Sequence, residues 1–154
     1  MDSEDIEKKT FKELIKEFNS MYGLDVNDNP TLPTLERLKN FKSILSEEVE
    51  EINDIIENYE SSLNENQELE KEKEMELMTD ISDVLGDLVV YIRSEATKYG
   101  IELEKTLDII MQSNFSKLGE DGKPIYDERG KVMKGPNYWK PEPKIQKLLK
   151  DNSE

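Results

Sequence analysis

The amino-acid sequence predicts an all-α fold, in which four helices precede an irregular C-terminal tail with a small hairpin. Apolar residues recur at intervals of three and four in four separate segments, and this spacing places them on one face of a helix. Charged residues make up 37% of the 154 residues and apolar residues only 34%. This balance favours thin helical layers, and association between subunits that adds buried surface.

The first two expected helices flank a break that is rich in glycine, asparagine and proline. The first helix covers residues 3–22, with Ser3 as its N-cap. The sequence GLDVNDNPTLP then ends it. Thr34 is the expected N-cap of the second helix, which runs to about Ser61.

Two more helices follow a polar and acidic stretch, residues 61–73, which we expect to form a loop or a frayed helix end. The third helix covers about 74–99, and Gly100 suits its C′ position. The fourth covers about 103–117 and ends before Gly119.

The remaining residues form a tail. PIYDERGKVM predicts a small hairpin, because strand-like pairs flank a glycine-containing turn. KIQKLLK is either a short terminal helix or an extended end. Without any internal repeat, we expect one domain over residues 1–154, with a core at about 3–118 and a substrate-facing tail at about 119–143.

Composition restricts the chemistry that is available. The sequence lacks cysteine and histidine, which excludes disulfides and thiolate catalysis and removes the commonest general base. The formal net charge of −15 disfavours nucleic acids and anionic membranes as partners. No apolar stretch is long enough for a transmembrane helix, and the acidic N-terminus is unlike a signal peptide. We therefore expect a cytoplasmic protein.

Carboxylates interrupt the apolar face of the second expected helix. Glu48 and Glu51 fall on a stripe that also holds Ile44 and Ile55, and Glu47 lies one turn before Glu51. In the third helix, three carboxylates lie on one face and are surrounded by aliphatic residues. They are Asp80, Asp83 and Asp87. An unpaired buried carboxylate costs several kcal/mol, and bound Mg²⁺ or Mn²⁺ would remove this cost. The alternative interpretation is a solvated acidic face.

Three motifs together resemble a known family. EEVEE (47–51) contains Glu-Glu-x-x-Glu, DISDVLGDLVVYI (80–92) follows in the next long helix, and the tail reads SNFSKLGEDGKPIYDERGKVMKGPNYWKPEP (113–143). They resemble the all-α nucleoside triphosphate pyrophosphohydrolases, the superfamily of MazG, dimeric dUTPases and phosphoribosyl-ATP pyrophosphatase. The resemblance covers residues 35–143.

This resemblance implies a four-helix MazG-like bundle that assembles as a homodimer or homotetramer. It implies hydrolysis of a nucleoside triphosphate to the monophosphate and pyrophosphate, with Mg²⁺ or Mn²⁺ as the cofactor. The implied metal ligands are Glu48, Glu51, Asp80 and Asp83, and Glu47 is a ligand or the base that orients the attacking water. The family usually has glutamate where this sequence has Asp80, and the aspartate side chain is shorter by one methylene.

Other residues are candidates for binding substrate. Asp87 could bind a second ion, contact the substrate or support the site. Lys117 and Lys134 could hold the distal phosphates, and Asn114 a phosphate or the sugar. The nucleotide base could stack on or hydrogen-bond to Asn137, Tyr138 and Trp139. The alternative is that the lysines are solvated and that Trp139 is a core plug of the tail.

The sequence leaves the substrate open among dUTP, dCTP and damaged or non-standard nucleotides. A role as the phosphoribosyl-ATP pyrophosphatase of histidine biosynthesis is a second interpretation within this enzyme class. A third, from another class, is a non-catalytic acidic helical module that binds a basic surface.

Overall fold

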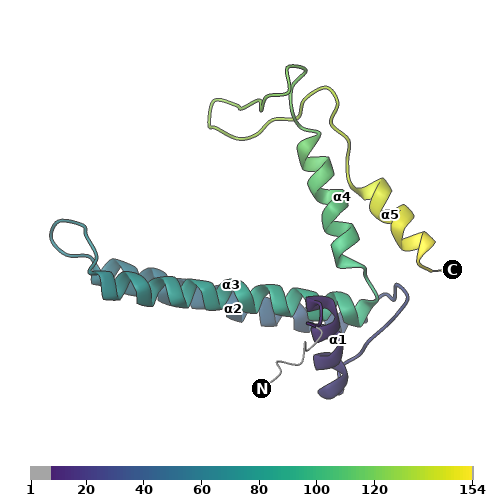
Figure 1. Cartoon of the computed structure of the whole chain (residues 1–154), viewed down its shortest axis with the longest axis horizontal. Helices are drawn as coiled ribbons and strands as arrows, with labels where there is room; N and C mark the ends of the chain where they lie inside the picture. Colours follow the sequence, from purple (N-terminus) through teal and green to yellow (C-terminus); the bar gives the residue numbers. More distant parts are fainter. Residues whose placement is uncertain (1–7, 154) are drawn as a thin grey trace, which may run out of the picture. The chain divides into compact units, whose positions relative to one another are not determined.

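The computed structural model describes residues 8–153, which contain five helices (Figure 1). Their bounds are α1 Phe11–Met21, α2 Leu35–Ser62, α3 Lys71–Tyr99, α4 Leu103–Phe115 and α5 Glu142–Asp151. The chain divides into two compact units, of which the first contains α1, α2 and α3 and the second contains α4, α5 and residues 27–31. The all-α prediction is confirmed, whereas the single domain stays a prediction.

α1 begins later than the sequence predicts. Thr10 and Glu13 form a capping box, in which the Thr10 hydroxyl accepts from the Glu13 N–H and the Glu13 carboxylate accepts from the Thr10 N–H. These two bonds satisfy backbone donors that a helix end leaves free, so the helix starts at Phe11. The expected cap, Ser3, lies outside the described residues.

α2 and α3 form a long antiparallel pair (Figure 1). Thr34 caps α2 as predicted, because its hydroxyl accepts from the Arg37 N–H. Between the helices, the Asn64 side chain accepts from the N–H groups of Asn66 and Glu68 and closes a short turn. The polar stretch is therefore a loop of residues 63–70, and α3 starts three residues before the predicted position.

A buried amide fastens α1 to α3. Asn19 has no exposed surface. Its Nδ2 donates to the carbonyl oxygens of Asp25 and Ser94, and its Oδ1 accepts from the Ser94 hydroxyl at 2.8 Å. Because an unpaired buried amide is costly, these bonds fix where α1 can lie along α3.

In the second unit, α4 packs against α5. The segment KIQKLLK lies within α5, so it forms a terminal helix rather than an extended end. The expected hairpin is reduced to one antiparallel bridge between Tyr126 and Val132. Asp127 explains this, since its carboxylate accepts from the N–H groups of Arg129 and Lys131 and tightens the turn. What remains on either side is too short for a ladder.

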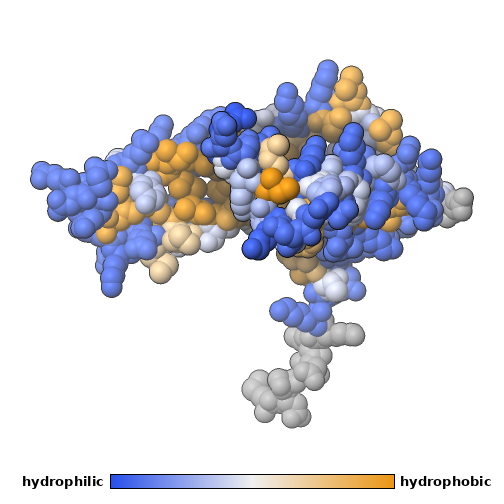
Figure 2. Space-filling model, turned by 90° about the horizontal axis from the view of Figure 1, so that it is seen from above, coloured by the Kyte–Doolittle hydropathy of each residue, from blue (hydrophilic) through white to orange (hydrophobic). Residues whose placement is uncertain are grey.

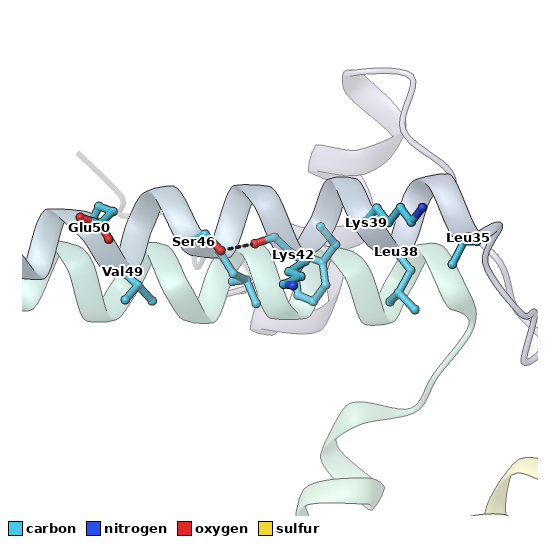
Figure 3. A pocket seen from close by; sticks show the side chains of 9 residues that line it. Leu35, Leu38, Lys39, Lys42, Ser46, Val49 and Glu50 are labelled. Atoms are coloured by element: carbon cyan, nitrogen blue, oxygen red, sulfur yellow. Dashed lines mark hydrogen bonds between the residues drawn. The ribbon is translucent and has the colours of Figure 1, made fainter.

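Neither unit contains four helices, so the expected four-helix bundle is not found within a unit. The apolar core is small and consists of Ile15, Leu77, Val84, Ala96 and Tyr99 among residues 8–153. Large apolar side chains are exposed along α2 and α3. Orange patches are visible on the face drawn in Figure 2, and Figure 3 shows a groove lined by residues of α2. In residues 8–153, no helix is long and apolar enough to cross a membrane.

The Asn19→Ala variant should be less stable than the wild type by about 1–3 kcal/mol, because it leaves the Ser94 hydroxyl and a loop carbonyl without their partner. Urea denaturation followed by circular dichroism measures this difference. Asn53→Ala, on the exposed side of α2, is the matched control and should change the free energy of unfolding by about 0.5 kcal/mol at most. Equal effects of the two variants would contradict the anchoring role of Asn19.

Candidate active site

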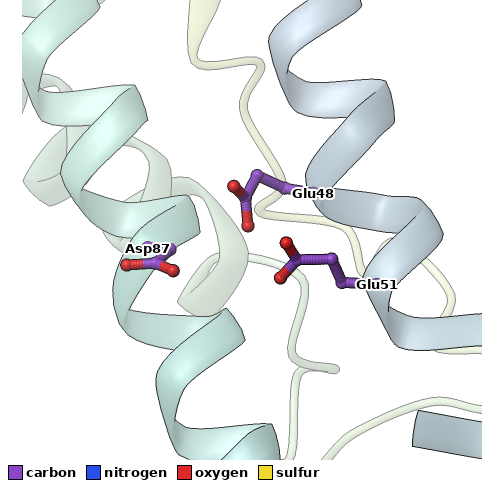
Figure 4. A group of neighbouring side chains, drawn as sticks. All are labelled: Glu48, Glu51 and Asp87. Atoms are coloured by element: carbon purple, nitrogen blue, oxygen red, sulfur yellow. The ribbon is translucent and has the colours of Figure 1, made fainter. Parts of the chain in front are cut away.

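α2 and α3 bring three carboxylates together. Glu48 and Glu51 come from α2 and Asp87 comes from α3, and their side chains point toward one another (Figure 4). One oxygen from each carboxylate lies within 4.8 Å of the others. We call these three residues the carboxylate group.

Helix geometry explains this convergence. Glu48 and Glu51 are one turn apart, on the face of α2 where Ile44 and Ile55 are half-buried. Asp87 lies one turn from the buried Val84 and so shares the inner face of α3. Antiparallel pairing of the two faces places the carboxylates opposite each other.

The surroundings of Glu48 disfavour its negative charge. Its Oε2 atom is buried and has no hydrogen-bond partner. Burial raises the pKa of Glu48 above its ordinary value of 4.5, and the charges of Glu51 and Asp87 raise it further. The Tyr91 hydroxyl acts in the opposite direction on this pKa, because it can donate a hydrogen bond to the carboxylate.

Divalent cations fit this donor set. Three carboxylates offer the hard oxygen ligands that Mg²⁺ and Mn²⁺ prefer. A cation would also supply the buried Glu48 oxygen with the partner that it lacks. The carboxylate group is therefore a candidate metal centre.

Tyr91 is a residue of the site that the sequence analysis missed. Burial raises its pKa above 10.0, as do the nearby charges of Glu48, Asp87 and Glu51. Its signal in the sequence is the spacing of four from Asp87, which puts both side chains on one face of α3.

The structure selects among the expected carboxylates. Glu47 and Asp83 are exposed and Asp80 is half-buried, and none of the three belongs to the carboxylate group, the one such group among residues 8–153. Their roles as base or ligands stay predictions. Asp87, for which the sequence left three roles open, is the residue of α3 that joins Glu48 and Glu51.

The expected substrate-binding residues of the tail belong to the second unit. The Lys134 ammonium lies 5.0 Å from the centroid of the Tyr138 ring. Lys117 is half-buried, whereas Asn114 and Asn137 are exposed. Their roles toward a substrate stay predictions.

The backbone of Trp139 is tied to the end of α4. Its carbonyl accepts from the Ser113 hydroxyl at 2.9 Å, and its N–H donates to the Ser116 hydroxyl at 3.2 Å. The Lys144 ammonium lies 3.7 Å from the centroid of its half-buried ring. Gly135 packs closely on the segment after α4, since a Cβ there would lie 2.0 Å from the Leu118 carbonyl oxygen.

Comparison with known proteins supports the fold. No family model matches the chain, and no curated protein matches it. Among solved structures, it is similar to a protein of Exiguobacterium sp. 255-15 named as a putative NTP pyrophosphohydrolase, with a TM-score of 0.51 and 24% sequence identity. The match covers 94% of this chain and 96% of that chain. The chain therefore has the all-α fold of that protein.

The raised pKa of Glu48 predicts how the metal-free protein responds to pH. Above pH 4.5 the folded state holds the Glu48 proton more tightly than the unfolded state, so this residue contributes less stability as the pH rises through its pKa in the folded protein. In EDTA, the free energy of unfolding of Glu48→Gln should therefore increase relative to that of the wild type as the pH rises from 4.5 towards neutrality. Urea titrations over this range measure the gain. The exposed control, Glu57→Gln, should run parallel to the wild type, and a parallel Glu48→Gln curve would refute the effect.

Proposed function

We propose that the protein hydrolyses a nucleoside triphosphate between its α- and β-phosphates, in a reaction that depends on a divalent cation. The products are the nucleoside monophosphate and pyrophosphate. The observation that carries this proposal is the carboxylate group, in which Glu48 and Glu51 face Asp87 and one Glu48 oxygen is buried without a partner. The fold shared with a protein named as a pyrophosphohydrolase supports it.

Mg²⁺ is the proposed cofactor, and Mn²⁺ could replace it. The residues proposed to hold it are Glu48, Glu51 and Asp87, with Asp80 and Asp83 as further ligands. When bound, such an ion neutralises phosphate oxygens and makes a nearby water easier to deprotonate. Without a cation, the same carboxylates would repel a polyanionic substrate.

The chain itself supplies the remaining steps. Glu47 is exposed and directly precedes Glu48 in α2. We propose that its carboxylate is the general base that accepts the proton of the attacking water. The water oxygen forms a bond to phosphorus, the bond of the α–β anhydride breaks, and pyrophosphate leaves. A carboxylate base fits a sequence without histidine.

The tail is proposed to bind the rest of the substrate. Lys117 and Lys134 would hold the distal phosphates, and Asn114 a phosphate or the sugar. The base would contact Asn137, Tyr138 and Trp139. Substrates to be tested are dUTP, dCTP and non-standard nucleoside triphosphates. Self-association as a homodimer or homotetramer is part of the proposal, since α2 has no buried residue within the chain.

Pyrophosphate release, measured across a panel of nucleoside triphosphates with Mg²⁺ or Mn²⁺, tests this function. The wild type should release pyrophosphate, and Glu48→Gln and Asp87→Asn should each reduce kcat/KM by more than about 100-fold, because loss of a ligand costs more than loss of an outer-shell partner. Glu57→Gln is the control on the same helix and should retain activity. Release of pyrophosphate by Glu48→Gln at the wild-type rate would remove Glu48 from the site.

Metal binding has a separate test in thermal denaturation. Adding Mg²⁺ or Mn²⁺ should raise the Tm of the wild type by mass action, and Asp87→Asn should abolish the rise. Asp83→Asn is the matched variant one turn away on α3, and it should lose less of the rise because Asp83 lies outside the carboxylate group. The opposite order would favour Asp83 as the ligand, and no rise in the wild type would favour a non-catalytic acidic module.

A further inference from the structure

Lys144, in the first turn of α5, has an aromatic ring as its partner. Its ammonium lies 3.7 Å from the centroid of the Trp139 ring, and α5 packs against α4 (Figure 1). Lys134 lies in the same way over the ring of Tyr138, at 5.0 Å. Both lysines are exposed. Two neighbouring aromatic residues of the tail therefore each have an exposed lysine over the ring.

These two lysines are not neutralised by carboxylates, although the chain has 36 acidic residues and only 21 basic ones. Over residues 8–153, no ion pair involves Lys134 or Lys144. Lys147, one turn further along α5, lies instead 3.6 Å from the Asp151 carboxylate. A ring attracts a cation without cancelling its charge, so the charges of Lys134 and Lys144 remain available to an anion.

Trp139 brings Lys144 to the end of α4. The Trp139 carbonyl and N–H are both bonded to serine hydroxyls within residues 113–116. Directly after this segment, the Lys117 carbonyl accepts from the Gly135 N–H at 2.8 Å. Lys117 also has no ion pair among residues 8–153. The chain therefore offers several uncompensated positive charges in the tail, around one end of α4.

Phosphate is the anion that suits this arrangement. A charge-assisted hydrogen bond between an ammonium and a phosphate is stronger than a cation–π contact at an exposed site. A phosphate can therefore draw the Lys144 ammonium away from the Trp139 ring. Until then the ring restricts the rotamers of the lysine side chain, which lowers the entropy cost of binding.

We propose that Lys144 is a further substrate-binding residue, which holds a distal phosphate of the nucleoside triphosphate, and that Trp139 positions its ammonium. This inference rests on the proposed function. It adds a residue of α5, which lies outside the region 35–143 that resembles known pyrophosphohydrolases. It also makes Trp139 a positioning residue for the phosphate contact.

Binding of inorganic tripolyphosphate, which carries no base, tests the contact directly. Isothermal titration calorimetry with Mg²⁺ should give a measurable Kd for the wild type, and Lys144→Gln should raise it about 10-fold or more, because a charged contact to phosphate is lost. Lys144→Arg keeps the charge and should stay within about 3-fold of the wild-type Kd.

Lys147→Gln is the matched control for calorimetry. It removes one positive charge from the same helix, and it should bind tripolyphosphate as the wild type does, because Lys147 already has the Asp151 carboxylate as its partner. Equal Kd values for Lys144→Gln and Lys147→Gln would overturn the proposal. So would a wild type that does not bind tripolyphosphate.

Fluorescence tests the role of the ring. Trp139 is the only tryptophan of the chain, so the intrinsic tryptophan emission reports on this ring alone. Tripolyphosphate should change the emission of the wild type and of Lys147→Gln along the same saturation curve as the heat of binding, because the ammonium leaves the ring as the phosphate binds. A constant emission while tripolyphosphate binds would refute the positioning role of Trp139.

Steady-state kinetics separate this contact from the hydrolysis itself. In assays of pyrophosphate release, Lys144→Gln should raise KM about 10-fold and leave kcat within about 3-fold, because the contact is made equally in the ground state and the transition state. A wild type that binds tripolyphosphate through Lys144 and releases no pyrophosphate would refute the hydrolytic function and leave the contact standing. An active wild type whose KM is unchanged by Lys144→Gln would refute the contact alone.

Discussion

The antiparallel pairing of α2 with α3 is the interaction on which the candidate site depends. It sets which residue of one helix faces which residue of the other, and so it places Asp87 opposite Glu48 and Glu51. The pairing itself is held by few buried apolar side chains, chiefly Leu77 and Val84 of α3. The Asn19 bonds to Ser94 tie the end of this pair to α1.

The same helices carry a cost in the metal-free protein. Buried polar atoms without partners destabilise a fold, and Glu48 Oε2 is one of them. Two neighbouring carboxylates add repulsion, which is why the pKa of Glu48 is raised by burial and by charge together. A bound cation would remove this cost, so under the proposed function folding and cation binding are linked through these oxygens.

α2 carries apolar residues on two of its faces. The inner face meets α3 and holds Glu48 and Glu51, while a groove lined by Leu35, Leu38 and Val49 stays open within the first unit. A helix with apolar residues on two faces and carboxylates on one of them is poorly stabilised as part of a lone pair of helices. This explains why its apolar content exceeds what the chain buries, although the whole sequence is rich in charge.

Local patterns in the sequence determined the helices. Thr34 and Gly100 marked helix ends because capping and positive φ are properties of a few adjacent residues. Periodicity also predicted that carboxylates of α2 and α3 share apolar faces, since a repeat of three and four residues defines one face of a helix. It could not select Asp87 over Asp80 and Asp83, because all three lie on one stripe and only the register between two helices brings one of them to Glu48. Register, like the division into two units, arises from contacts between residues distant in sequence, so it could be read only from the tertiary structure.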